Sequence, residues 1–228
     1  MTRREDVETF YQIITDLEKV VGGKHLLAEC HGRMAWPERG VYFFFEDGQL
    51  RENSKPRVVR IGTHGLKNGS KRRLWERLSQ HRGTASGGGN HRGSIFRLHV
   101  GTAIMERDGL HSATWSKGRT AKNDVTSREL PIENLVSQYI GQMPFLWIEV
   151  NDPPERNSMR GYIERNSIGL LSNFGKPERI DASTQSWLGN YAWQGKIKAS
   201  GLWNVKHVED GYEPEFLDVL RKYVEEMK

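Results

Sequence analysis

Four side chains suited to phosphate chemistry fall within residues 42–81. Tyr42 lies in an aromatic run, Arg60 lies in a second apolar run, and Arg77 and His81 are four residues apart. On a helix, that spacing places a guanidinium and an imidazole one turn apart, about 6 Å along the axis. A guanidinium binds phosphate through two hydrogen bonds, and an imidazole carries protons near neutral pH. The pattern therefore indicates a phosphate-binding site.

One carboxylate stands apart from the others. Glu164 has no Asp or Glu within eight residues on either side, and it lies in a segment, 159–171, whose pattern predicts a helix. Mg²⁺ is usually bound through one or two carboxylates and several waters, so Glu164 is a candidate metal ligand. The alternative is a surface residue that pairs with Arg160 or Arg165.

The positive charge of the chain is concentrated in one segment. The 228 residues carry 34 Lys and Arg against 29 Asp and Glu, a net charge of +5, and residues 51–92 hold eleven basic and two acidic residues. Such a segment indicates a phosphate-facing surface, unless the acidic N-terminal part of the chain neutralises it. The residues that we expect to contact nucleic acid are Arg57, Lys71, Arg72, Arg73, Arg82, His91 and Arg92.

The first half of the chain supplies the elements that would position these side chains. Apolar residues at helical spacing predict a helix over 8–21, which ends at a glycine pair. Residues 40–46 and 57–62 are rich in aromatic and β-branched side chains and predict an antiparallel hairpin. Alternation places Tyr42 on the face opposite Val41 and Phe43.

The remaining elements are less regular. A glycine-rich loop precedes a predicted strand, and residues 102–131 show no period. The other expected elements are helix 74–81, strand 94–100, helix 132–140, strand 144–150, helix 159–171 and a closing helix over 216–227. This order predicts an α+β fold, a small mixed or antiparallel β-sheet flanked by helices.

In their order along the chain, these residues resemble the motifs of the GIY-YIG nuclease family. Gly40-Val41-Tyr42 is similar to the first motif, Arg60-Ile61-Gly62 to the second, Arg77 with His81 to the helix motif, and Glu164 to the metal carboxylate. Asn173 matches the closing asparagine by spacing, with Asn190 as the alternative. Arg60 replaces the tyrosine of the second motif, and some restriction enzymes of the family resemble this chain in having a cation there.

The resemblance covers residues 40–173, which would form a GIY-YIG-like nuclease core. It implies an insertion over about 101–143, because the family's minimal module is shorter. Residues 1–39 then form an N-terminal helical extension, and residues 174–228 form a C-terminal extension that ends in a helix. We expect these parts to make one compact unit.

The resemblance also implies an activity, the metal-dependent hydrolysis of phosphodiester bonds in DNA, here expected to be double-stranded, with Mg²⁺ or Mn²⁺. It implies that Tyr42 prepares the attacking water, that Arg77 and His81 act at the phosphate, and that Glu164 holds the metal. A free phenol has a pKa near 10. We therefore expect the cation of Arg60 to stabilise the phenolate.

Two other classes of function remain open. One is a catalytically silent nucleic-acid-binding protein with the same fold, and the presence of Tyr42, Arg77, His81 and Glu164 favours the enzyme over it. The other is an interaction protein built on tryptophans 187, 193 and 203, which would need no basic segment.

The chain lacks the signals of a membrane or secreted protein. Its longest apolar run, residues 41–45, is too short to span a bilayer, and no apolar segment follows the basic pair near the N-terminus. A single cysteine, Cys30, fits a reducing compartment. We expect a cytoplasmic protein without a membrane partner, as a monomer or a homodimer.

Overall fold

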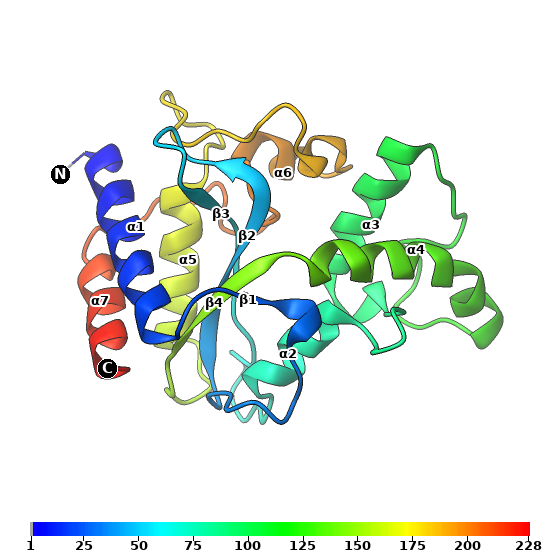
Figure 1. The fold of residues 1–228 in the computed structure, drawn as a ribbon, viewed down its shortest axis with the longest axis horizontal. Helices are drawn as coiled ribbons and strands as arrows, with labels where there is room; N and C mark the ends of the chain where they lie inside the picture. The colour runs from blue at the N-terminus through cyan, green and yellow to red at the C-terminus, as the bar shows by residue number, and fades with distance from the viewer. Residues whose placement is uncertain (1) are drawn as a thin grey trace.

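A four-stranded sheet lies at the centre of the computed structural model, which describes residues 2–228 (Figure 1). Its strands run in the order β1-β4-β2-β3, and every pairing is antiparallel. The strands are β1 (His25–Leu26), β2 (Gly40–Leu50), β3 (Pro56–Gly62) and β4 (Pro144–Glu149). The α+β fold expected from the sequence is confirmed, and the sheet is antiparallel throughout.

Helices cover both faces of the sheet (Figure 1). They are α1 (Arg3–Val20), α2 (Leu74–Arg82), α3 (Ile95–Asp108), α4 (Asn123–Gly141), α5 (Met159–Leu171), α6 (Gly195–Ser200) and α7 (Phe216–Glu226). Three 3₁₀ turns join them, η1 (Leu27–Glu29), η2 (His91–Gly93) and η3 (Leu188–Tyr191). Across residues 2–228, every helix is too short or too polar to traverse a lipid bilayer.

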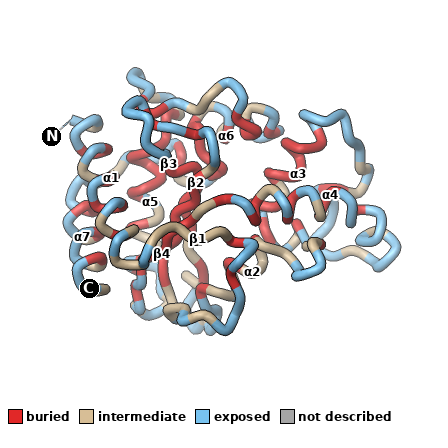
Figure 2. The backbone as a smooth tube through the Cα atoms, viewed as in Figure 1, coloured by how far each residue is buried: buried red, intermediate tan, exposed pale blue. Residues whose placement is uncertain are grey.

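The alternation of β2 divides the core into two clusters. Val41, Phe43 and Phe45 pack with α1, α5 and α7 on one face, and Tyr42 and Phe44 pack with α2, α3 and α4 on the other. Strand β2 is buried along most of its length (Figure 2). The two faces expected for this strand are therefore confirmed.

The hairpin of β2 and β3 fixes the positions of the two sequence motifs. Tyr42 pairs with Gly62, and Phe44 pairs with Arg60, so all four residues lie on one face of the sheet. A Cβ atom at Gly62 would collide with the Tyr42 hydroxyl, and one at Gly40 would collide with the carbonyl of Ile148. Both motif glycines are therefore required by close contacts.

The strand expected over 94–100 is wrong, because these residues begin α3. Ser94 caps this helix, since its Oγ accepts the N–H of Arg97 at 3.3 Å. Phe96, Val100 and Ile104 then recur at helical spacing on a buried face. Taken alone, residues 94–100 have the β-branched and aromatic composition of a strand. The helical spacing becomes evident only when the following residues, up to Ile104, are included.

The helix expected over 132–140 is longer than predicted. It forms the second half of α4, which begins at Asn123 and contains Pro131. The segment 102–131, which has no clear period, thus contributes to two helices that pack against each other and extend away from the sheet (Figure 1). The division into a core, an insertion and two extensions stays a prediction.

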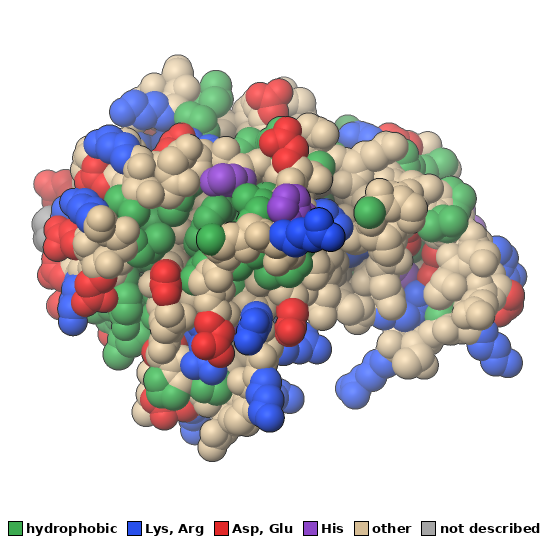
Figure 3. Space-filling model, turned by 60° about the horizontal axis from the view of Figure 1, so that its bottom comes forward, with side chains coloured by type: hydrophobic (Ala, Val, Ile, Leu, Met, Phe, Trp, Pro, Cys, Tyr) green, Lys and Arg blue, Asp and Glu red, His purple; other side chains and the backbone are tan. Residues whose placement is uncertain are grey.

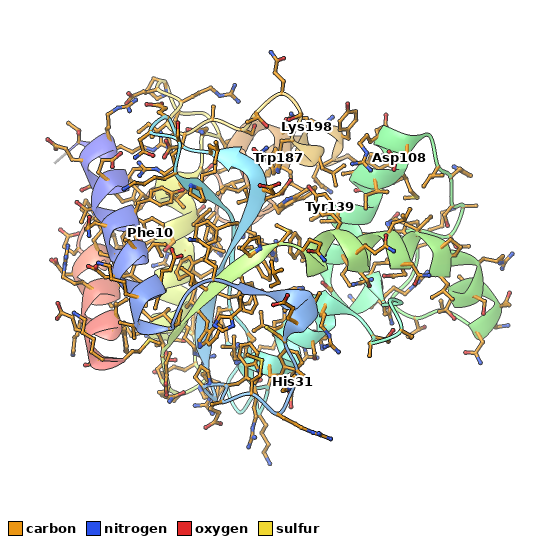
Figure 4. All side chains as sticks on the ribbon, in the orientation of Figure 1. Phe10, His31, Asp108, Tyr139, Trp187 and Lys198 are labelled. Carbon is orange, nitrogen blue, oxygen red and sulfur yellow. The ribbon has the colours of Figure 1, made fainter. Side chains whose placement is uncertain are left out.

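Two of the three tryptophans considered for an interaction surface are buried. The indole N–H groups of Trp187 and Trp203 donate to Oε2 of Glu46 at 3.0 and 3.1 Å, and the hydroxyl of Tyr139 donates to its other oxygen. Trp187 and Tyr139 thus both bond the Glu46 side chain of β2, and in Figure 4 they lie on the other side of the sheet from Phe10 of α1. Trp187 and Trp203 therefore anchor the core.

Candidate active site

A cavity of about 460 Å³ beside β3 contains four of the residues singled out from the sequence. Its lining includes Tyr42 from β2, Arg60 from β3, Arg77 from α2 and Glu164 from α5. These residues are spread over more than 120 positions of the chain. The hairpin register and the two helices bring them together.

Tyr42 is linked to the protein interior by a chain of hydrogen bonds. Its hydroxyl lies 2.8 Å from Nε2 of His81, and Nδ1 of the same ring lies 2.7 Å from Oγ of Ser94. All three side chains are almost fully buried. His81 therefore lies behind Tyr42 and does not line the cavity.

The surroundings of His81 keep its ring neutral. Burial lowers the pKa of His81 well below its usual value, and the nearby guanidinium groups of Arg77, Arg60 and Arg97 lower it further. A neutral imidazole has one donor and one acceptor nitrogen. His81 can therefore donate a hydrogen bond from one nitrogen and accept one at the other, and either arrangement fits the two distances.

Arg60 is a buried cation on the same face of the sheet as Tyr42. Its Nη1 donates to the carbonyl of Trp203 at 2.8 Å, and its guanidinium lies 4.5 Å from the ring centre of Phe96. Its Nε has no hydrogen-bond partner among residues 2–228. Burial lowers the pKa of Arg60, and the negative form of Tyr42 is the strongest opposing influence. An arginine remains charged in proteins, so Arg60 places a cation beside the phenol.

Arg77 lines the cavity from α2 and keeps an uncompensated charge. Its Nη1 donates to the side chain of Gln80 and to the carbonyl of Gly93, both at 3.1 Å. Both acceptors are neutral. The guanidinium is only partly buried, so it is available to an anion in the cavity.

Glu164 supplies the only carboxylate of the cavity lining. Its Oε1 accepts the N–H of Thr63 at 3.2 Å. Burial raises the pKa of Glu164, and Arg60 is the largest opposing influence.

Residues 2–228 contain no cluster of three or more His, Cys, Asp or Glu side chains arranged around a metal position. A single carboxylate in the cavity lining suits Mg²⁺, which keeps most of its waters, and does not suit zinc.

Comparison with protein families agrees with this geometry. The family model described as the GIY-YIG domain matches residues 1–228. The chain belongs to the GIY-YIG family. This is a family of nucleases, whose substrates are nucleic acids. Neither the curated proteins nor the solved structures give a match.

The two asparagines proposed from spacing for the closing position of this GIY-YIG chain make structural hydrogen bonds. Asn173 lies outside the cavity lining, and its amide makes two 2.9 Å hydrogen bonds with the backbone of Ile180. Asn190 holds the carbonyls of Thr184 and Gln185, also outside the cavity. Asn204 is the asparagine that lines the cavity. It was missed because it lies 40 residues beyond Glu164.

Four of the seven residues expected to contact nucleic acid are engaged within the protein instead. Arg57 is buried and donates to Gln49 and Gly201, and Arg82 donates to the carbonyl of Cys30. His91 is buried against Glu133, and Arg92 pairs with Glu129. These side chains hold parts of the fold together, so the basic segment is only in part free to contact a partner.

The other three expected contacts are exposed. Lys71, Arg72 and Arg73 belong to the loop that joins β3 to α2, and Thr63 and Leu66 of the same loop line the cavity. On the face drawn in Figure 3, Lys and Arg side chains form separate groups with Asp and Glu among them. The exposed cations thus do not merge into one basic surface on that face.

The cavity of this GIY-YIG protein also contains residues that the sequence did not single out. His99 comes from α3, and Lys206 and His207 come from the segment after α6. These residues have no motif or spacing in common. Only the fold brings them to the site.

Proposed function

We propose that this chain is a metal-dependent endonuclease that hydrolyses phosphodiester bonds in DNA. The observation that supports it most strongly is that one cavity collects Tyr42, Arg60, Arg77 and Glu164. These side chains match the needs of the reaction. The attacking water must lose a proton while negative charge builds on the phosphate.

Tyr42 prepares the attacking water. The phenol first gives its own proton to solvent through the cavity, and the phenolate oxygen then accepts a proton from the attacking water. The neutral ring of His81 can donate the N–H of Nε2 to that oxygen at 2.8 Å. The cation of Arg60 stabilises the phenolate from the neighbouring strand. His81 acts through Tyr42 rather than at the phosphate, because it is buried behind the phenol.

Arg77 binds the scissile phosphate. Its guanidinium faces the cavity without a carboxylate partner among residues 2–228, so its charge stabilises the negative charge that develops during hydrolysis. Glu164 would hold a Mg²⁺ or Mn²⁺ ion through its carboxylate oxygens. Such an ion, when bound, supplies positive charge next to the leaving oxygen.

The substrate we propose is double-stranded DNA in the cytoplasm. The exposed cations Lys71, Arg72 and Arg73 follow the loop at the edge of the cavity and can contact a duplex that reaches Arg77. Cys30 is a free and buried cysteine, in keeping with a reducing compartment.

Incubation with supercoiled plasmid DNA tests the proposal. We expect the wild-type protein to nick or linearise the plasmid with Mg²⁺ and not with EDTA, and we expect the Glu164→Ala variant to bind DNA without cutting it. A wild-type protein that binds the plasmid but never cuts it, with either Mg²⁺ or Mn²⁺, would support the silent binding protein and contradict the nuclease.

A further inference from the structure

One wall of the cavity is built by a segment, Trp203–His207, that lies outside all of the sequence motifs. The five consecutive residues of this wall segment line the cavity together with Tyr42, Arg60, Arg77 and Glu164. The segment belongs to the C-terminal part of the chain, and it follows the short helix α6.

The wall segment is fastened to β3, the strand at the edge of the sheet. The N–H of Trp203 donates to the carbonyl of Val59 at 2.7 Å, and Arg60 donates to the carbonyl of Trp203. The amide of Asn204 then bonds both backbone groups of Ile61, at 3.1 and 2.8 Å. Because these contacts replace a neighbouring strand, they fix the segment beside Arg60.

The other end of the segment is fastened to the end of α5. The hydroxyl of Ser172 donates to the carbonyl of the buried Val208 at 2.6 Å. His207 has a φ of 64°, a left-handed conformation that is uncommon for a residue with a side chain, and its Nδ1 lies 2.7 Å from Asp210. The residues between the two anchors are therefore held in a defined path along the cavity.

Lys206 carries a free charge on this path. It is exposed, and it lines the cavity. Two neighbouring side chains have acidic partners, since Lys196 contacts Glu209 and His207 contacts Asp210. Lys206 has no ion-pair partner in the part of the chain that the structure describes. Cations without partners are the groups that a bound phosphate would satisfy.

The charges around the cavity favour a polyanion. Arg60, Arg77 and Lys206 are cations, and Glu164 is the one carboxylate of the lining. In the proposed function, Arg77 binds the scissile phosphate. The guanidinium of Arg60 already donates to the carbonyl of Trp203 in the wall segment. Lys206 is left for a second phosphate of the same strand.

We propose that the wall segment Trp203–His207 binds the DNA strand beside the scissile phosphate, with the ammonium group of Lys206 contacting a neighbouring backbone phosphate. This rests on the proposed function, because the same cavity must receive the DNA. It adds a substrate-binding residue from the C-terminal part of the chain to a site otherwise built by residues 42–164.

Salt dependence of DNA binding tests the inference without any cleavage. The affinity for a fluorescein-labelled DNA duplex is measured by anisotropy in EDTA at increasing NaCl concentration. Each phosphate contact contributes about 0.9 to the slope of log K against log salt. We expect Lys206→Met to reduce that slope by about 0.9, and Lys206→Arg to keep the wild-type slope.

A matched control is Lys222→Met, at an exposed position of α7 on the other side of the sheet, which should leave the slope unchanged. An unchanged slope in Lys206→Met, or no binding of the duplex by the wild type, would overturn the inference. If the slope falls in Lys206→Met while the wild type never cuts plasmid, only the nuclease activity is contradicted. If the wild type cuts plasmid and the slope does not change, only the role of Lys206 is contradicted.

Discussion

The hydroxyl of Tyr42 and Nε2 of His81 are joined by a 2.8 Å hydrogen bond that connects the cavity to the protein interior. Tyr42 contributes to the cavity lining, whereas His81 is fully buried behind it and contacts Ser94 with its other nitrogen. The two residues come from β2 and α2, and the bond is made where the helix packs on the sheet. This places a neutral imidazole, which can donate a hydrogen bond to the phenol oxygen, directly behind Tyr42.

Replacement of His81 should separate catalysis from binding. We expect His81→Leu to slow single-turnover cleavage by about 10²- to 10³-fold, the usual effect of losing a preorganised hydrogen-bond donor to a charge that develops during the reaction. DNA affinity should stay within error of the wild type, because His81 does not line the cavity. A variant that cuts at the normal rate but binds DNA weakly would instead place His81 at the phosphate.

Arg60 should set the pH dependence of cleavage. If its guanidinium stabilises the phenolate of Tyr42, the pH–rate profile of Arg60→Met should move to more alkaline pH, because the negative form of the side chain then lacks a neighbouring cation. The profile is measured under single-turnover conditions, with circular dichroism to confirm folding. An unshifted profile with weaker DNA binding would make Arg60 a phosphate-binding residue.

The positions of the candidate site residues follow from signals that are local in the sequence. The β-branched and aromatic runs predict β2 and β3, and helical spacing predicts α2 and α5. The predicted bounds of α5, residues 159–171, match the structure. Once the hairpin pairs, Tyr42 and Arg60 must share a face. Four of the site residues could therefore be found without knowledge of the packing.

Other parts of the site depend on contacts between distant residues. The sign of the charge on Arg57 or Arg92 is evident from the sequence, but their partners Gly201 and Glu129 are 144 and 37 residues away. Helix α3 was mistaken for a strand because its first turn is rich in β-branched and aromatic residues. Lys206 reaches the cavity only because Asn204 is bonded to β3.

The buried imidazole of His99 should make the protein less stable in acid. Burial, together with the charge of Arg60, lowers the pKa of His99 to about 4. Above pH 6.5 the ring is neutral in both states and the stabilisation is complete. Between pH 6.5 and 4 the unfolded chain binds a proton that the folded protein does not, so stability falls as the pH falls.

Urea unfolding from pH 7 to pH 4 measures this loss. The contribution of His99 is on the order of 3 kcal/mol, and His99→Leu should lose that much less stability over the same range. The exposed His31 provides a control, since His31→Leu should leave the pH dependence unchanged. If His99→Leu and the wild type lose stability equally between pH 7 and pH 4, the fold does not lower the pKa of His99, and the prediction is wrong.

Asn173 should matter for stability and not for cleavage. Its amide bonds Ile180 twice and also accepts from Arg3, so Asn173→Ala leaves buried backbone groups without partners, at a cost of about 1–3 kcal/mol. For a chain of this size, that lowers the melting temperature by roughly 2–4 °C per kcal/mol. Loss of cleavage at a temperature where the variant is folded would restore the catalytic role expected from the sequence.

The substitution Tyr42→Phe tests the central claim most directly, because it removes one oxygen and keeps the ring that packs against Phe44. The measurement is the single-turnover rate of DNA cleavage with saturating Mg²⁺, compared with DNA affinity in EDTA. The account predicts a rate at least about 10²-fold below the wild type, with unchanged affinity. A Tyr42→Phe variant that cuts DNA as fast as the wild type would contradict it.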